Sequence, residues 1–554
     1  MWKSLIALGA ALCASPAFSI TLIDHANGIQ TDAAGRITHF TGLVVGDDGK
    51  IVRVLRAGDR RPTAAHRIDV QGGTLLPGLI DAHGHVMDLG MKLTLLDVTG
   101  VRSLGELKQR LSAYAAAHPE ARWIVGRGWN QELWAEKRFP AARDLDAVVG
   151  DRPVWLVRVD EHAAVANSAA MRAAGITAET RDPAGGKIER DASGSPAGLF
   201  VDNARELVES KIPAPSIEQQ DRAFDATQQL LLSFGVTATD DMATTANAWN
   251  VFRRAADAGR LKVRLVSFAY GRDNLAKIAP NGPTPWLYND HLRSVGLKLF
   301  ADGALGSRGA WMKQPYADAP DTRGIPRITP DALLRDADWA AARHFQVAVH
   351  AIGDAANAMV ISAYQALAKK YGRDRRWRIE HAQIIDPADI PRMAPAGIIA
   401  SMQPTHETSD RLMAEARLGP NRLQGAYAWR TIARSGVPLA FGSDYPVESP
   451  NPFPGLSAAI SRQDVNGQPP GGWIPSERLS LAQALSAFTR GAAYASFSED
   501  RYGSLEPGKW ADFILVDRDP TKVDPPALAR TRVLETWIGG KKMWSSPSPA
   551  PPAK

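Results

Sequence analysis

Two histidines separated by one glycine, His83 and His85, end an apolar, β-rich run of residues 79–85. Side chains two positions apart on a strand point to the same face, so both imidazoles can reach one point in space. Neutral imidazole is a common ligand of Zn2+ and of related divalent metals. Because a lone His-x-His pair also occurs in packing and surface roles, the metal hypothesis depends on further ligands.

Four more polar side chains occupy similar positions in or at the ends of later β-rich runs, and they are Lys298, His350, His381 and Asp444. Lys298 is unusual because a lone ammonium inside an apolar strand, beside metal cations, would be costly. Carboxylation by CO2 would convert it into an anionic carbamate that can bridge two metals; a pair with Asp302 is the alternative. We therefore predict a centre of two Zn2+ ions bridged by carboxylated Lys298, with Mn2+ or Fe2+ as alternatives.

Asp444 is the candidate catalytic residue of this set. A carboxylate that touches both a metal and its bound water can accept a proton from that water, whose pKa the metal lowers. We expect the nucleophile to be a metal-bound hydroxide and Asp444 to pass the proton to the leaving nitrogen of a cleaved C–N bond. The alternative is that Asp444 only caps the turn in Gly442-Ser443-Asp444.

The elements that must position these side chains are short β-rich runs alternating with helical segments. Eight strand candidates can be counted, at residues 79–85, 236–241, 263–268, 295–301, 346–350, 378–381, 398–402 and 439–444. Eight βα units predict an α/β fold with a parallel (β/α)8 TIM barrel, in which active sites lie at the carboxyl ends of the strands. The candidate ligands fall at those ends.

Other segments lie outside the barrel expected at residues 78–499. The gap after the first strand is too long for one βα connection, so residues from about 100 to 230 predict an insertion, interpreted as a lid. Short β-rich runs in residues 20–77 and 500–545 predict a small β-sandwich domain built from both termini. Residues 546–554 are rich in Ser, Pro and Ala and are expected to be disordered.

The amino terminus has the pattern of a secretory signal. A lysine precedes an apolar run and a small-x-small site, so we expect cleavage after Ser19, removal of residues 1–19 and a periplasmic or secreted protein. The one cysteine, Cys13, would leave with this segment, which excludes cysteine–metal sites and a cysteine nucleophile. The net charge of +6 comes without a run of Lys or Arg, so we predict no nucleic-acid partner. No later apolar run is long enough to span a membrane.

Several segments together resemble the amidohydrolase superfamily, and within it the amidohydrolase-3 group that includes N-substituted formamide deformylase. They are residues 76–85 (LPGLIDAHGH), 298–308 (KLFADGALGSR), 350–354 (HAIGD), 378–381 (RIEH), 403–406 (QPTH), 442–446 (GSDYP) and 505–512 (LEPGKWAD). The resemblance covers nearly all of the expected mature chain in family order. It implies a metal site formed by the six candidate ligands and a β-sandwich that both termini build around the barrel.

The same resemblance implies a set of substrate contacts, with two departures. The group carries Asp-Gly-His before an Asn-Ser pair, and here Glu161 replaces the glycine before His162. A Gly-Trp-Asp segment becomes Gly128-Trp129-Asn130. We take His162, Trp129 and His406 as substrate-contact candidates, with packing as the alternative. Arg308, just past the fourth strand, either orients a substrate carbonyl or pairs with Asp302.

The leading hypothesis is hydrolysis of a non-peptide amide bond in a small molecule, such as an N-substituted formamide or another linear amide. A cyclic-amide or a dipeptide or N-acyl-amino-acid hydrolase is a close alternative on the same scaffold. A deaminase is less favoured because residues 350–354 lack the expected glutamate. From another class, the chain could be a catalytically inactive barrel that binds a small molecule. A homodimer is a further possibility.

Overall fold

The computed structural model describes residues 19–159, 162–183 and 185–547. All but the last residue of the expected signal segment lies outside the described residues, as do positions 548–554 of the expected tail. The chain divides into two compact units. One runs up to Val86 and continues from Gln228 onward, and the other spans Met87–Thr227.

The larger unit contains a sheet of eight parallel strands, in which each strand pairs with the next one in the chain. The strands are β6 (Leu79–Gly84), β13 (Val236–Thr244), β14 (Arg264–Tyr270), β15 (Leu292–Phe300), β16 (Gln346–Ala351), β17 (Trp377–His381), β18 (Ile398–Met402) and β19 (Leu439–Phe441). Gly84 pairs in parallel with Tyr445, just beyond β19, so the first and last strands meet. The structure therefore confirms the predicted TIM barrel, and each predicted strand lies within a few residues of an observed one.

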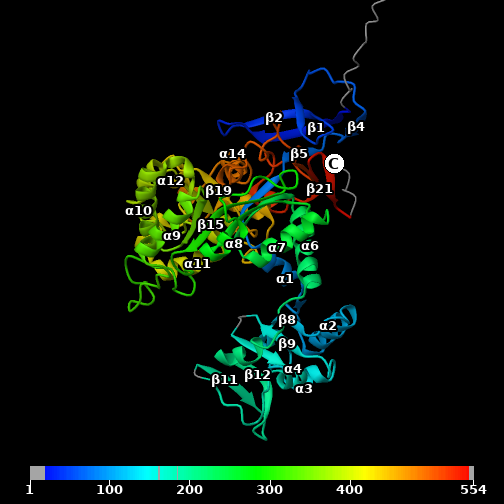
Figure 1. Cartoon of the computed structure of the whole chain (residues 1–554), viewed down its shortest axis with the longest axis vertical. Helices are drawn as coiled ribbons and strands as arrows, with labels where there is room; N and C mark the ends of the chain where they lie inside the picture. Colours follow the sequence, from blue (N-terminus) through cyan, green and yellow to red (C-terminus); the bar gives the residue numbers. More distant parts are fainter. Residues whose placement is uncertain (1–18, 160–161, 184, 548–554) are drawn as a thin grey trace, which may run out of the picture. The chain divides into compact units, whose positions relative to one another are not determined.

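Helices follow the barrel strands and form its outer layer, as α7 to α10 show in Figure 1. They are α7 (Ala246–Asp257), α8 (Gly271–Ile278), α9 (Pro330–Ala342), α10 (Asp354–Tyr371), α11 (Pro404–Leu418), α12 (Trp429–Arg434), α13 (Pro452–Ser461), α14 (Leu481–Ala487), α15 (Arg490–Ala495) and α16 (Pro525–Ala529). Side-chain oxygens of Thr245, Thr329 and Ser480 cap three of them at the amino end. Within the described residues, no helix combines the length and apolarity that a membrane span requires.

Strands from both ends of the chain form one further sheet, seen in Figure 1 where β1, β2 and β5 lie beside β21. Its members are β1 (Thr21–Thr31), β2 (Ile37–Val45), β3 (Ile51–Leu55), β4 (His66–Asp69), β5 (Thr74–Pro77), β20 (Phe513–Val516), β21 (Val533–Ile538) and β22 (Lys541–Ser545). Phe40 of β2 and Trp537 of β21 share one apolar core although their strands are not neighbours. The β domain built from both termini is therefore observed.

The second unit has a sheet of its own, in the order β11-β12-β10-β9-β8-β7. Its elements are β7 (Leu96–Asp97), β8 (Ile124–Trp129), β9 (Val154–Arg158), β10 (Ala163–Ala166), β11 (Gly186–Arg190), β12 (Pro196–Asp202), α2 (Leu104–Ala117), α3 (Ala142–Asp146), α4 (Ser168–Ala173) and α5 (Glu206–Glu209). Helices α1 (Val86–Thr94) and α6 (Ile217–Ser233) connect it to the barrel strands in sequence. Two separate apolar clusters are built from its residues, so this segment has its own core.

A buried ion pair joins the barrel to the β domain. Arg264 of β14 donates through Nε and Nη2 to the two carboxylate oxygens of Asp512, at 2.6 and 3.0 Å. The Arg264 guanidinium also lies over the Trp510 ring, 4.8 Å from its centroid. Both charged side chains are buried, so either one would be left without its counterion if the other were removed.

We predict that Asp512→Ala lowers the free energy of unfolding by about 3 to 5 kcal/mol, because Arg264 would remain buried and unpaired. Asp338→Ala, which breaks the exposed pair with Lys370, should cost about 1 kcal/mol or less. Urea unfolding followed by tryptophan fluorescence measures both. Equal losses in the two variants would show that the Arg264–Asp512 pair has no special structural role.

Candidate metal centre

The His-x-His pair lies against Asp444 at the carboxyl ends of β6 and β19. Asp444 Oδ1 lies 3.0 Å from His85 Nε2 and 3.6 Å from His83 Nε2. Lys298 Nζ approaches the same His83 nitrogen at 3.5 Å. These four side chains come from β6 and the residue that follows it, from β15 and from the turn after β19, so the barrel brings together residues far apart in the sequence.

The two remaining predicted ligands complete the cluster. The His381 ring lies with its centroid 4.7 Å from that of His83 and 4.6 Å from that of His350. His381 Nδ1 lies 4.0 Å from Asp444 Oδ2. All six candidate ligands therefore surround one small region, as the sequence predicts.

Local backbone conformation places two of these side chains. His381 has φ 73° and Asp444 has φ 59°, in the left-handed region that non-glycine residues seldom adopt. Such strain is maintained where surrounding structure fixes it, and it is common at functional sites. Gly84 is required for a different reason, because a Cβ there would lie 2.2 Å from the Tyr445 ring.

Three of the histidines have a hydrogen-bond acceptor at one ring nitrogen. His83 Nδ1–H donates to Glu380 Oε2 at 2.6 Å, and His381 Nδ1–H donates to Gln403 Oε1 at 2.9 Å. His350 Nε2 lies 3.5 Å from the carbonyl oxygen of Gly303. A proton held on that nitrogen leaves the other with a lone pair, which is the arrangement of metal-binding histidines.

A buried charge network supports His83 from within the barrel. Arg378 donates through Nε to Glu380 Oε1 at 2.7 Å and through Nη1 to Asp240 Oδ2 at 2.6 Å. It also donates to the carbonyl oxygen of Ala82 at 2.7 Å. The guanidinium neutralises the Glu380 carboxylate, whose pKa stays well below its usual range because Arg378 and His83 outweigh the effect of burial. Glu380 therefore remains an anionic acceptor for His83.

The protonation states fit a metal site. Burial, assisted by Lys298, lowers the pKa of His83 to about 4 and that of His350 to about 3, so both imidazoles are neutral near pH 7. Burial would raise the pKa of Asp444, but the hydrogen bond with His85 and the neighbouring imidazoles hold it well below its usual range. His83 and His350 therefore offer neutral nitrogens and Asp444 offers an anionic carboxylate, which are donors that Zn2+ prefers. At His85 burial would lower the pKa, but the hydrogen bond with Asp444 and the charge of that carboxylate outweigh it and raise that pKa.

Lys298 is fully buried, and burial lowers the pKa of its amine to about 8. Within the described residues no carboxylate forms an ion pair with it; its ammonium lies near His83 and 5.1 Å from the Phe300 ring centroid. The alternative pair with Asp302 does not form. The Asp302 carboxylate instead accepts the backbone N–H groups of Trp311, Ile352 and Gly353.

The structure separates the four candidate substrate contacts. His406 lies within the cluster, with Nε2 3.7 Å from Asp444 Oδ2. Arg308 instead donates to Asp318 at 3.1 and 2.9 Å and does not pair with Asp302. Trp129 is buried in the core of the second unit, where its indole N–H donates to the Leu156 carbonyl at 2.7 Å. His162 is exposed on that unit, 2.9 Å from Asp202.

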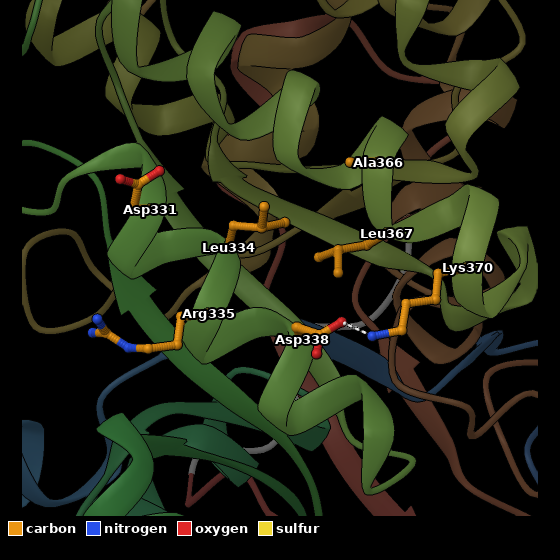
Figure 2. Close-up of a pocket in the computed structure, with 7 residues that line it drawn as sticks. All are labelled: Asp331, Leu334, Arg335, Asp338, Ala366, Leu367 and Lys370. Carbon is orange, nitrogen blue, oxygen red and sulfur yellow. Dashed lines mark hydrogen bonds and ion pairs between the residues drawn. The ribbon is translucent and has the colours of Figure 1, made fainter.

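A surface pocket between α9 and α10 is unrelated to this cluster. Figure 2 shows its charged lining, in which Lys370 of α10 reaches Asp338 of α9, with Leu334 and Leu367 between the helices. The pocket lies on the outer helical layer, and none of the six candidate ligands lines it. We therefore place the functional site at the strand ends and not at this pocket.

Sequence reasoning did not single out Glu380, Arg378 or Gln403 as supporting residues. A signal was present, because Arg378 and Glu380 interrupt a buried barrel strand whose other residues are Trp377, Ile379 and His381. Two charges two positions apart on a buried strand indicate a paired interior role. Gln403 carries no such signal, because its contact with His381 depends on the turn after β18.

Comparison with known proteins agrees with this geometry. The sequence model of the amidohydrolase family matches residues 67–543. The chain is 34% identical to LONG AFTER FAR-RED 3 of Arabidopsis thaliana, over 86% of this chain and 83% of that protein. It is 28% identical to N-substituted formamide deformylase of Arthrobacter pascens, over 86% and 89%.

A solved structure extends the likeness to three dimensions. An uncharacterized metal-dependent hydrolase from Pyrococcus horikoshii superposes with a TM-score of 0.76 at 26% identity, covering 92% of this chain and 99% of that one. The family match spans both the β domain and the barrel. Two groups of side chains are close enough to hold a metal ion, and they are His83, His85 and Asp444, and His381, His406 and Asp444. The chain therefore belongs to the amidohydrolase family of metal-dependent hydrolases.

Proposed function

We propose that this protein hydrolyses a non-peptide C–N bond of a small-molecule amide, with N-substituted formamides and other linear amides as the first candidates. The observation that carries the proposal is the position of Asp444, whose two oxygens face different histidines of one cluster. The similarity to N-substituted formamide deformylase supports the choice of amides. Cyclic amides, dipeptides and N-acyl-amino acids form the comparison set for a substrate screen.

We propose that the cluster holds two divalent metal ions, with Zn2+ as our first choice because imidazole nitrogens and a carboxylate predominate. His83, His85, His350, His381 and Asp444 would hold them together with Lys298. When bound, such ions lower the pKa of water and polarise the carbonyl group of an amide.

Asp444 is suited to proton transfer during the reaction. Its carboxylate is anionic near pH 7 because the neighbouring imidazoles keep its pKa low. It can accept a proton from the attacking water and deliver it to the leaving nitrogen, which must be protonated before it departs as an amine. The acyl carbon gains the water oxygen and loses its bond to nitrogen, so the products are a carboxylic acid and an amine, and the atoms of one water are divided between them.

We also propose that Lys298 is carboxylated. The support is geometric: the side chain is fully buried, next to His83, and makes no ion pair with a carboxylate among the described residues. Burial disfavours the ammonium more than the charges of Glu380 and Asp444, which act from beyond ion-pair distance, favour it. Metal cations beside it would add repulsion. Addition of CO2 to the neutral amine, with loss of one proton, gives a carbamate whose two oxygens share one negative charge, so the side chain no longer carries a positive charge in the cluster.

Asp444→Asn should reduce kcat for N-benzylformamide, or for the best amide in the screen, by at least about 100-fold, because the neutral amide cannot accept the proton. Circular dichroism should show an unchanged fold. Asp338→Asn, on the outer helix α9, is the matched control and should retain wild-type kcat. A kcat near the wild-type value in Asp444→Asn would exclude this residue as the base.

Lys298→Ala should lose most of the bound metal, because the proposed bridging carbamate would be absent. Elemental analysis after reconstitution with Zn2+ measures this loss, and added acetate or propionate should restore part of the metal. Lys370→Ala, which removes a surface lysine, should bind as much Zn2+ as the wild type. Full metal content in Lys298→Ala would contradict the carbamate proposal.

We further propose that the protein is exported to the periplasm or secreted, on the basis of the signal-like residues 1–19. Expression of the full chain in a Gram-negative host should give a periplasmic product whose first residue, determined by mass spectrometry, is Ile20. Substitution of Ala17 by Arg should block this processing. An uncleaved product retained in the cytoplasm would contradict the proposal.

A further inference from the structure

His406 lies in the metal-ligand cluster but differs from its neighbours in how it is held. It belongs to the first turn of α11, and its ring is stacked on that of His381 with an interplanar angle of 16° and centroids 6.0 Å apart. The side chain is buried, and its Nε2 has no hydrogen-bond partner among the described residues. An unpaired buried donor or acceptor is costly unless it has a ligand to bind.

The hydrogen-bond partner of His406 Nδ1 determines whether Nε2 is a donor or an acceptor. Gln383 Nε2, an amide donor, lies 3.2 Å from His406 Nδ1, so Nδ1 must accept. A neutral imidazole that accepts through Nδ1 carries its proton on Nε2. The position of Asp444 Oδ2, 3.7 Å from His406 Nε2, favours the same tautomer because a carboxylate attracts an N–H group.

His406 faces a hydrogen-bond donor, whereas three of the predicted metal ligands face acceptors. His83 and His381 face the acceptors Glu380 Oε2 and Gln403 Oε1, and His350 lies near a carbonyl oxygen. The other ring nitrogen of each is left with a lone pair, whereas His406 presents a hydrogen on Nε2, the nitrogen that faces Asp444. His381, His406 and Asp444 are close enough to bind one metal, but His406 could do so only after a shift of its proton and a flip of the Gln383 amide.

We infer that His406 is a hydrogen-bond donor to the carbonyl oxygen of the substrate, and that Gln383 is the positioning residue that keeps its proton on Nε2. The inference rests on the proposed amide hydrolysis and assigns one residue within it. As water attacks the amide carbon, the carbonyl oxygen gains negative charge. A preoriented N–H group within the site stabilises that charge more strongly than it stabilises the neutral substrate.

The decisive comparison is between metal binding and turnover in two variants of neighbouring histidines. His406→Leu should retain the wild-type amount of Zn2+ per chain after reconstitution, whereas His381→Leu should lose metal. With the best amide substrate, His406→Leu should lower kcat about 100- to 1000-fold while changing KM little. His406→Gln, which keeps an N–H donor of similar reach, should recover much of that loss.

Gln383 provides an independent test that leaves His406 in place. Gln383→Met removes the amide donor with little change in volume, so the His406 proton is no longer fixed on Nε2. We expect full Zn2+ content, a lower kcat by roughly 10-fold and an unchanged KM. Gln365→Met, on the outer helix α10, is the control and should match the wild type in all three measurements.

The outcomes distinguish this inference from the function on which it rests. Loss of Zn2+ in His406→Leu to the extent seen in His381→Leu would overturn it and make His406 a ligand, whatever the substrate is. Full Zn2+ with an unchanged kcat would overturn it as well. A wild-type protein that binds Zn2+ but hydrolyses no amide would instead refute the proposed function, while the metal measurement on His406 would still stand.

Discussion

The closure of the barrel between its first and last strands is the constraint on which the rest of the site depends. Asp444 N donates to the His83 carbonyl at 2.7 Å, and His85 N donates to the Tyr445 carbonyl at 2.8 Å. Asp81 strengthens the joint by accepting both the backbone N–H and the hydroxyl of Ser443, at 3.0 and 2.6 Å. Because side-chain positions follow the backbone, this pairing brings the Asp444 carboxylate to the two imidazoles.

Buried charge is tolerated here because each group is compensated within the barrel. Arg378 lies between Glu380 and Asp240, and Glu380 in turn accepts a hydrogen bond from His83 Nδ1–H. Removing one member of such a network exposes the others to an uncompensated desolvation cost. Lys298 is the exception, since burial is not matched by an ion pair, and this imbalance is the physical reason to expect chemical modification at that residue.

Much of the fold and the central ligands could be predicted from the sequence because local patterns determine them. Strand ends are visible as the ends of apolar runs, and parallel strands place those ends at one rim, so His83, His381 and Asp444 could be grouped without a structure. Contacts that depend on turns could not be predicted from the sequence. Arg308 turns to Asp318, and Trp129 packs in the second unit, because loop geometry and local cores decide their partners.

The donor or acceptor beside a histidine distinguishes roles that residue type alone cannot distinguish. His381 and His406 are both buried histidines near Asp444, and a search by residue type and distance treats them alike. His381 Nδ1 faces the side-chain oxygen of Gln403, and His406 Nδ1 faces the side-chain nitrogen of Gln383. A neutral imidazole carries one N–H proton, so an acceptor at Nδ1 leaves a lone pair on Nε2, and a donor at Nδ1 leaves the N–H on Nε2. The contact with Gln403 therefore suits His381 to bind a metal, and the contact with Gln383 suits His406 to donate a hydrogen bond to the substrate.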